Sequence, residues 1–412
     1  MTKVRLDSWK AIAEYLERSS RTVQRWHAYH GLPVHHFGGS KGSVFAYAED
    51  IDHWLVGLAE ETRIAAGGED EGLAARKSRS FALTSSADEM WETRSERNLH
   101  TIAGFYREAI DEYPANAAAF IGLANTMIFA AAFGIMDPSA AYPRAREALR
   151  RMPQLDAASL DAKCAEAWIN LMNERKWRQA RTGFEEVLCE RPRSSFALSG
   201  QALLCIAEDN LQEAARYAQE AWTQNRMACS LAALLCWVQY LAGDYEQALE
   251  LAEEVRTSGG CGATVAAIEA LALIQAGLAA RVPHRIEEIA GDFPQSQNLQ
   301  GVLGYAWAVS GQTDKALEIF RSLEQMSEMK KRNHGYALAL VCIGLNRRQE
   351  AISWLEAAYA EGALPSLGLR SDPILRPLRG EQRFELLRRK IGSPAGNGIQ
   401  TGFSSGYAAR ES

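Results

Sequence analysis

The sequence predicts a mainly α-helical protein, in which a small N-terminal domain with one hairpin precedes a solenoid of repeated helical hairpins. Three observations lead to this fold class. Apolar residues recur about every 34 residues through most of the chain, they have helical spacing within each period, and the first 60 residues instead combine two short helical patterns with a strand-like pair. With 412 residues and 47% hydrophobic content, the chain is able to bury such cores.

The N-terminal domain is predicted over residues 1–60. Asp7 or Ser8 is suited to cap a first helix over 9–17, and Ser20 is suited to cap a second helix over 21–29. Two short helices joined by a tight polar turn are typical of a helix-turn-helix. A strand-like pair with a Gly-rich tip then indicates a hairpin, and a third helix follows it.

The order helix, turn, helix, wing, helix resembles the winged helix-turn-helix of excisionases and MerR-type regulators. The residues that carry this resemblance are Ser8 to Leu16, Arg21 to Trp26, Gly31 to Val34 and Phe45 to Tyr47. The resemblance covers about fifty residues. MerR-type regulators add a coiled coil and an effector domain that this chain lacks, so the resemblance implies no ligand or metal sensing.

The second helix carries the candidate contacts to double-stranded DNA. Val23 and Trp26 are three residues apart and should face the first helix, which leaves an outward face of Arg21, Thr22, Gln24 and Arg25. Arg reads guanine and Gln reads adenine in a major groove, while Thr bonds to phosphate. By the resemblance these four would be recognition-helix contacts, with Lys41 as a wing contact. The alternative is that this basic face contacts only solvent and binds no DNA.

Charge is distributed unevenly between the two parts of the chain. Residues 1–48 have seven basic and three acidic side chains, a net charge of +4, which leaves −10 for the remainder of a chain whose total is −6. Positive charge is therefore concentrated in the first 48 residues, and the position of charge matters more for partners than the total. Four histidines, His27, His30, His35 and His36, crowd this domain, but without a Cys or acidic partner at suitable spacing we expect no metal and no cofactor.

Residues 61–86 are predicted to be a flexible linker, because the stretch is charge-rich and punctuated by glycine. The repeats are predicted over 87–368, a C-terminal capping helix region over 369–392 and a disordered tail over 393–412.

The repeat is marked by a small or apolar anchor residue on one helix of each hairpin. The separations between successive anchors are 34, 34, 34, 34 and 35 residues, and a further apolar or small residue follows each anchor by four positions, on the same helical face. The anchors are Ala180, Ala214, Ala248, Val282, Ala316 and Ala351.

This pattern resembles the tetratricopeptide repeat (TPR). The best copy is Leu303, Gly304, Trp307, Ala316, Phe320 and Leu323, which follows the large, small, aromatic, small, aromatic order of that motif. Two earlier copies are stretched, since the separations from Ile102 to Ala141 and from Ala141 to Ala180 are both 39 residues. About eight TPR-like hairpins are therefore expected, and the resemblance implies a protein or peptide partner in the concave groove of this α-solenoid. The alternative is an array that packs only against itself or the N-terminal domain.

Residues 117–136 are apolar enough to suggest a membrane helix, but they are rich in Ala and Gly, lack flanking basic clusters and fall in phase with the repeat. We therefore expect no membrane span. The chain start has no secretory pattern and the seven cysteines form no CxxC pair, which favours a cytoplasmic protein.

The sequence thus predicts a DNA-binding transcriptional regulator whose array binds a protein partner or mediates oligomerisation, with a homodimer needed for tight DNA binding. The alternative is a protein-protein interaction scaffold with an N-terminal docking module that does not bind DNA. No phosphate-binding loop, nucleophile elbow or zinc-protease motif is present, so we do not expect an enzyme.

Overall fold

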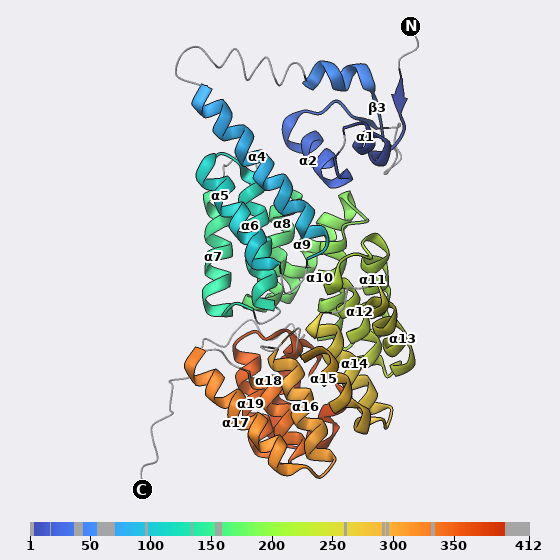
Figure 1. The fold of residues 1–412 in the computed structure, drawn as a ribbon, viewed down its shortest axis with the longest axis vertical. Helices are drawn as coiled ribbons and strands as arrows, with labels where there is room; N and C mark the ends of the chain where they lie inside the picture. The colour runs from blue at the N-terminus through green and yellow to red at the C-terminus, as the bar shows by residue number, and fades with distance from the viewer. Residues whose placement is uncertain are drawn as a thin grey trace. The chain divides into compact units, whose positions relative to one another are not determined.

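The computed structural model describes residues 4–16, 18–36, 44–55, 71–94, 98–132, 135–152, 159–258, 262–290, 293, 296–330 and 334–391. These residues are mainly helical, as predicted (Figure 1). They divide into two compact units, the first comprising Met1–Thr126 and Glu147–Ala157, the second Met127–Arg146 and Ala158–Ser412. Each unit is described by itself.

The first unit begins with a small domain of two short helices, three short strands and a further helical segment. Its elements are β1 (Arg5–Leu6), α1 (Trp9–Tyr15), α2 (Ser20–His30), β2 (His35–His36) and β3 (Val44–Tyr47), and residues 48–55 are helical. Both outer strands pair antiparallel with β3 in the order β1-β3-β2. The predicted order of two helices, a strand pair and a third helix is therefore present, while the predicted hairpin tip and its Lys41 lie outside the described residues.

The turn between α1 and α2 is fixed by side-chain caps. Ser8 caps α1, since its Oγ accepts from the N–H of Ala11 at 3.0 Å, as predicted. The cap of α2 is Ser19, not the predicted Ser20, and its Oγ accepts from the N–H of Thr22 at 3.1 Å. Gly31, at φ +65°, closes α2 in the left-handed conformation.

A small apolar core holds this domain together. Ile12 of α1, Val23 of α2, Val44 of β3 and Ile51 are all buried, and Trp26 packs against them from α2. Val23 and Trp26 therefore face inward as predicted, and the opposite face of α2 is turned away from the domain core.

The predicted linker over 61–86 is wrong for its second part, because residues 71–86 belong to α4 (Glu71–Glu92). Two polar residues of this stretch, Ser80 and Thr84, are buried where α4 packs against α5 (Leu99–Glu112) and the residues that follow it. Ser80 Oγ donates to the carbonyl of Ala109 at 2.6 Å, and Asn116 Nδ2 donates to Ser80 Oγ and Thr84 Oγ1 at 2.9 Å each. Buried hydroxyl groups satisfied in this way are compatible with a helix interface, which composition alone does not reveal.

Helices α4 and α5 open a succession of eight consecutive helix pairs within the described residues. The others are α6 (Ala117–Ala132) and α7 (Pro138–Arg151), α8 (Leu160–Ile169) and α9 (Trp177–Glu190), α10 (Ser195–Ala207) and α11 (Leu211–Gln224), α12 (Cys229–Ala242) and α13 (Tyr245–Thr257), α14 (Ala263–Gln275) and α15 (Val282–Ala290), α16 (Gln297–Val309) and α17 (Thr313–Lys330), α18 (Gly335–Gly344) and α19 (Arg348–Ala360).

The predicted register of the repeat is confirmed. All six anchors lie on the second helix of a pair and have no exposed surface, and the residue four positions after each is at most 6% exposed. Close approach between pairs uses glycine. A Cβ at Gly200 of α10 would lie 2.3 Å from the ring of Phe184 on α9, so only glycine fits beside this aromatic side chain.

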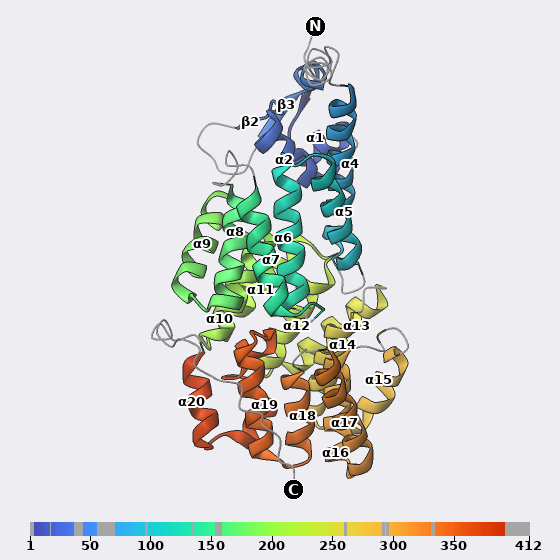
Figure 2. The ribbon, with the colours of Figure 1, turned by 90° about the vertical axis from the view of Figure 1, so that its left-hand side faces the viewer.

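The C-terminal segment folds back on the helices of the second unit. It forms two 3₁₀ helices, η4 (Leu364–Gly368) and η5 (Pro373–Leu378), and the short helix α20 (Gln382–Lys390), which lies beside α19 (Figure 2). A polar last helix is present as predicted. The segment before it, however, packs on α10, α12 and α18 rather than only on the last pair.

None of the helices in the described ranges is both long and apolar enough to cross a membrane. The apolar segment from Ala117 belongs to α6, most of whose side chains are buried.

Candidate functional site

The second unit contains an apolar cavity between the first helices of successive pairs. The space open to the centres of water molecules is about 90 Å³. Its wall includes four aromatic side chains from α6, α8, α12 and α18, which are Phe129, Trp168, Trp237 and Tyr336. A volume of this size exceeds several-fold the roughly 10–15 Å³ that one water needs, and an apolar lining favours an apolar occupant over water.

The wall of the cavity is completed by the C-terminal segment. Leu364 and Pro365 of η4 line it directly, and Gly368 lies so close to Trp237 that a Cβ there would be 2.8 Å from the indole ring. Asp372 accepts hydrogen bonds from Tyr240 at 2.7 Å and from Tyr336 at 2.5 Å, which fixes one aromatic wall. The chain itself therefore covers part of this apolar surface.

One polar group of the cavity has no partner. Ser230 is 9% exposed, lines the cavity, and its hydroxyl makes no hydrogen bond within the described residues. A buried hydroxyl without a partner costs free energy, which an occupant with one hydrogen-bonding group would offset. Nothing in the sequence pattern pointed to this serine.

The predicted DNA-contacting residues of α2 differ in their surroundings. Arg21 and Gln24 are exposed, as predicted. Thr22 is fully buried, so the prediction that it faces outward is wrong. The reason is the cap of α2, because the Thr22 hydroxyl lies 2.8 Å from that of Ser19, and this pair turns inward to close the helix start. Lys41 lies outside the described residues.

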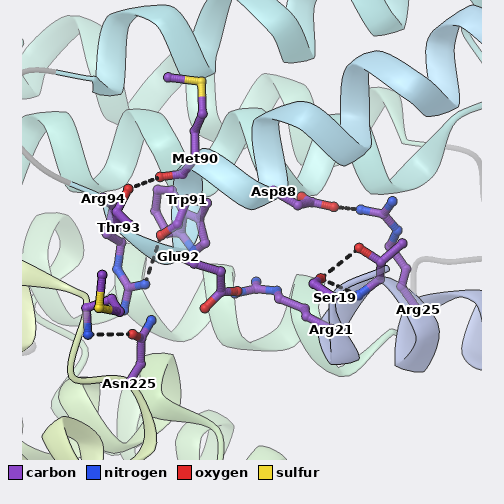
Figure 3. Close-up of polar contacts among 12 residues, drawn as sticks. Ser19, Arg21, Arg25, Asp88, Met90, Trp91, Glu92, Thr93, Arg94 and Asn225 are labelled. Carbon is purple, nitrogen blue, oxygen red and sulfur yellow. Dashed lines mark hydrogen bonds and ion pairs between the residues drawn. The ribbon is translucent and has the colours of Figure 1, made fainter. Parts of the chain in front are cut away.

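The two arginines of α2 are engaged by acidic residues of α4 (Figure 3). Arg25 forms an ion pair with Asp88, and Arg21 approaches Glu92 with 3.4 Å between Nη1 and Oε1. The Arg25 and Asp88 side chains are only 12% and 10% exposed. Asp88 and Glu92 were not predicted as site residues, because they lie beyond the predicted N-terminal domain. Their spacing of four residues does place them on one face of a helix.

A tyrosine of α5 completes this cluster. Tyr106 donates a hydrogen bond to Oδ1 of Asp88 at 2.6 Å. Burial raises the pKa of Tyr106 to about 12, although nearby Arg21 and Arg25 act to lower it, so the hydroxyl remains a donor at neutral pH. Asp88 is therefore held from two sides, by Tyr106 of the repeat array and by Arg25 of the N-terminal domain.

Two histidines of the N-terminal domain, His27 and His35, have ordinary partners. Nδ1 of His27 donates to the carbonyl of Leu32 at 2.8 Å, and the ring of His35 packs beside Phe45. Among the described residues, no three His, Cys, Asp or Glu side chains are grouped as metal ligands.

No protein-family model matches this chain, and no curated protein matches it. It is similar to the solved structure of a tetratricopeptide repeat protein from Parabacteroides merdae, at 16% identity, 64% coverage of this chain, 99% coverage of that chain and a TM-score of 0.42. It is also similar to pilF of Pseudomonas aeruginosa, at 15% identity, 55% and 97% coverage and a TM-score of 0.36. The array of helical hairpins is seen directly in the helix pairs of this chain and in their buried anchor residues.

Proposed function

We propose that the helical array is a non-catalytic binding scaffold for a protein partner, which inserts an apolar side chain into the cavity of the second unit. The aromatic wall of the cavity is the observation that carries this proposal. Protein interfaces derive most of their binding free energy from a few anchor side chains in desolvated pockets. Because η4 already covers part of the apolar surface, the space left suits one anchor side chain better than a whole partner helix.

A peptide selection tests this function. We expect peptides selected from a random displayed library by the full chain to share one aromatic or aliphatic position. They should lose binding to Ala267→Met, in which a longer side chain fills the cavity from α14. Ala82→Met, at an exposed position of α4, is the matched control. Selected peptides without an apolar position, or with equal affinity for both variants when Ala267→Met keeps its thermal stability, would refute the role of the cavity.

A second function, binding of double-stranded DNA, is proposed for the N-terminal domain. It is favoured by the capped helix-turn-helix with paired strands behind it, and by the exposed Arg21 and Gln24 on the face of α2 that is turned away from the domain core. Arg and Gln are the side chains that read guanine and adenine in a major groove. With the array, this domain would make the chain a transcriptional regulator.

A titration of the full chain on a mixed-sequence duplex tests DNA binding. We expect binding that weakens as salt is raised, because phosphate contacts release counterions. Arg21→Ala should weaken binding about tenfold, in the lower part of the range for one lost contact. Lys10→Ala removes the same charge from an exposed position of α1 and should have a smaller effect. Equal losses in both variants would exclude α2 as a DNA-reading helix.

A further inference from the structure

We propose that α4 inhibits DNA binding from within the chain, with the carboxylates of Asp88 and Glu92 occupying the two α2 arginines in place of DNA phosphates. This inference rests on the proposed DNA binding of the N-terminal domain and concerns the regulation of that same site.

The charges on the two helices match in spacing. Arg21 and Arg25 are four residues apart on α2, and Asp88 and Glu92 are four residues apart on α4. Each pair therefore spans about one helical turn, roughly 6 Å along the axis. Arg25 is placed on Asp88 and Arg21 on Glu92, so both arginines are engaged by one acidic face (Figure 3).

The pair between Arg25 and Asp88 is shielded from water, which distinguishes it from an ordinary surface ion pair. Exposed ion pairs contribute little because water and salt screen them, whereas burial weakens that screening. Once Arg25 is in this position, its guanidinium group is nearly inaccessible. The same guanidinium group would have to leave Asp88 before it contacted a phosphate or a base.

The inhibiting carboxylate belongs structurally to the repeat array. Tyr106 of α5 orients Asp88 through its hydroxyl, and α4 is fixed on α5 by Ser80, whose hydroxyl donates to Ala109. Exposed ion pairs also join Arg79 of α4 to Glu108 and Glu112 of α5. The acidic face is thus presented by the first helix pair of the array, and it is the N-terminal domain that must separate from it.

The experiment measures the Kd of the full chain for a mixed-sequence duplex in three forms. Asp88→Asn with Glu92→Gln removes both inhibiting charges, while the new asparagine still accepts from Tyr106. Glu89→Gln with Asp111→Asn removes two charges from exposed positions of α4 and α5, and it controls for the change in net charge. Wild-type chain is the reference.

We expect the Asp88→Asn, Glu92→Gln variant to bind DNA at least tenfold more tightly than wild type, and the control variant to differ from wild type by less than about threefold, the scale of screened surface charge. Adding Arg25→Ala to the Asp88→Asn, Glu92→Gln variant should abolish the gain. These results together support inhibition by α4.

Two other results separate the failure of this inference from the failure of DNA binding. If Asp88→Asn with Glu92→Gln leaves the Kd unchanged while Arg21→Ala weakens binding, α2 binds DNA and inhibition by α4 is overturned. If no form of the chain binds the duplex although circular dichroism shows all of them folded, the DNA-binding function fails and the inference fails with it.

Discussion

At the residue scale, the carboxyl group of Asp372 joins parts of the second unit that are far apart in sequence. It accepts from Tyr240, 132 residues earlier, and from Tyr336, and it also accepts from the N–H of Ile374 at 3.2 Å. Burial raises the pKa of Asp372 above its ordinary value, although these three donors act to lower it. The folded chain therefore binds the proton of this group more tightly than the unfolded chain.

Asp372→Asn should change the pH dependence of stability. A raised folded-state pKa gives a contribution that is present below the ordinary carboxyl pKa of 3.8 and is lost as pH rises through the folded-state value. Asparagine keeps an acceptor and does not ionise. We expect the Tm of Asp372→Asn to rise relative to that of wild type as the pH is raised from about 4, because only wild type loses this contribution. The control is Asp111→Asn, at an exposed position of α5. A Tm difference between Asp372→Asn and wild type that does not change with pH, or that equals the difference for Asp111→Asn, would contradict a raised pKa of Asp372.

The start of α2 gives a second prediction at this scale. Ser19→Ala removes the side chain that accepts from the Thr22 N–H and should cost about 1 kcal/mol of stability, the usual value for a lost helix cap. Ser20→Ala, at the first residue of α2, should cost little. The measurement is amide hydrogen exchange of α2, in which Ser19→Ala should lower protection more than Ser20→Ala does. Equal protection in both variants would show that Ser19 is not the cap.

Sequence reasoning at this scale succeeded where a single helix determines the outcome. Ser8 was one of two predicted caps, beside Asp7, and Val23 was predicted as a core residue, because local spacing narrows both choices. The predicted outward position of Thr22 is wrong, because helical spacing alone does not reveal that a threonine near the cap turns its hydroxyl toward Ser19. The hydrogen bond between Tyr240 and Asp372 could not be predicted from the neighbouring sequence either, because 132 residues separate the two.

At the element scale, the array depends on close contacts between one helix pair and the next. Phe184 of α9 occupies the space that a side chain at Gly200 of α10 would need. In the same manner, a Cβ at Gly122 of α6 would lie 2.2 Å from the ring of Tyr106 on α5. An aromatic residue facing a glycine on the following helix is thus a repeated contact of the array.

Gly200→Ala should therefore destabilise the chain even though alanine is the better helix former. Forcing a methyl group into a packed interface costs about 1–3 kcal/mol, which lowers Tm by several degrees. Gly104→Ala in α5 is the matched control, because a Cβ there has no neighbour within 4 Å. It should raise stability by up to about 1 kcal/mol, the difference in helix propensity. Similar Tm shifts in both variants would rule out the proposed packing.

The helix pairs were predictable from sequence because each anchor must be small or apolar to let two helices approach, and this requirement recurs with the repeat. Helix α4 was not predictable in this way. Its buried face contains Ser80 and Thr84, whose hydroxyls are satisfied by Ala109 and Asn116 of the neighbouring segment. A polar stretch that is buried through such bonds has the composition of a linker.

At the scale of the whole molecule, the two proposed binding surfaces arise from contacts between segments that are far apart in the sequence. The cavity requires η4 to fold back on α10 and α12, and the engaged arginines require α4 to meet α2. The positive charge of residues 1–48 and the negative charge of the remainder were visible in the composition. Their pairing through Arg25 and Asp88 was not, because it depends on which acidic residues the first helix pair presents.

The salt dependence of DNA binding tests most directly that α4 holds the arginines that bind phosphate. The Kd of wild type and of the Asp88→Asn, Glu92→Gln variant is measured on the same duplex over a series of salt concentrations. Each additional phosphate contact steepens the plot of log Kd against log salt by about 0.9, so we expect the variant to be steeper by about 1–2. Parallel plots for the two proteins would show that no arginine is released, and would contradict the role assigned to α4.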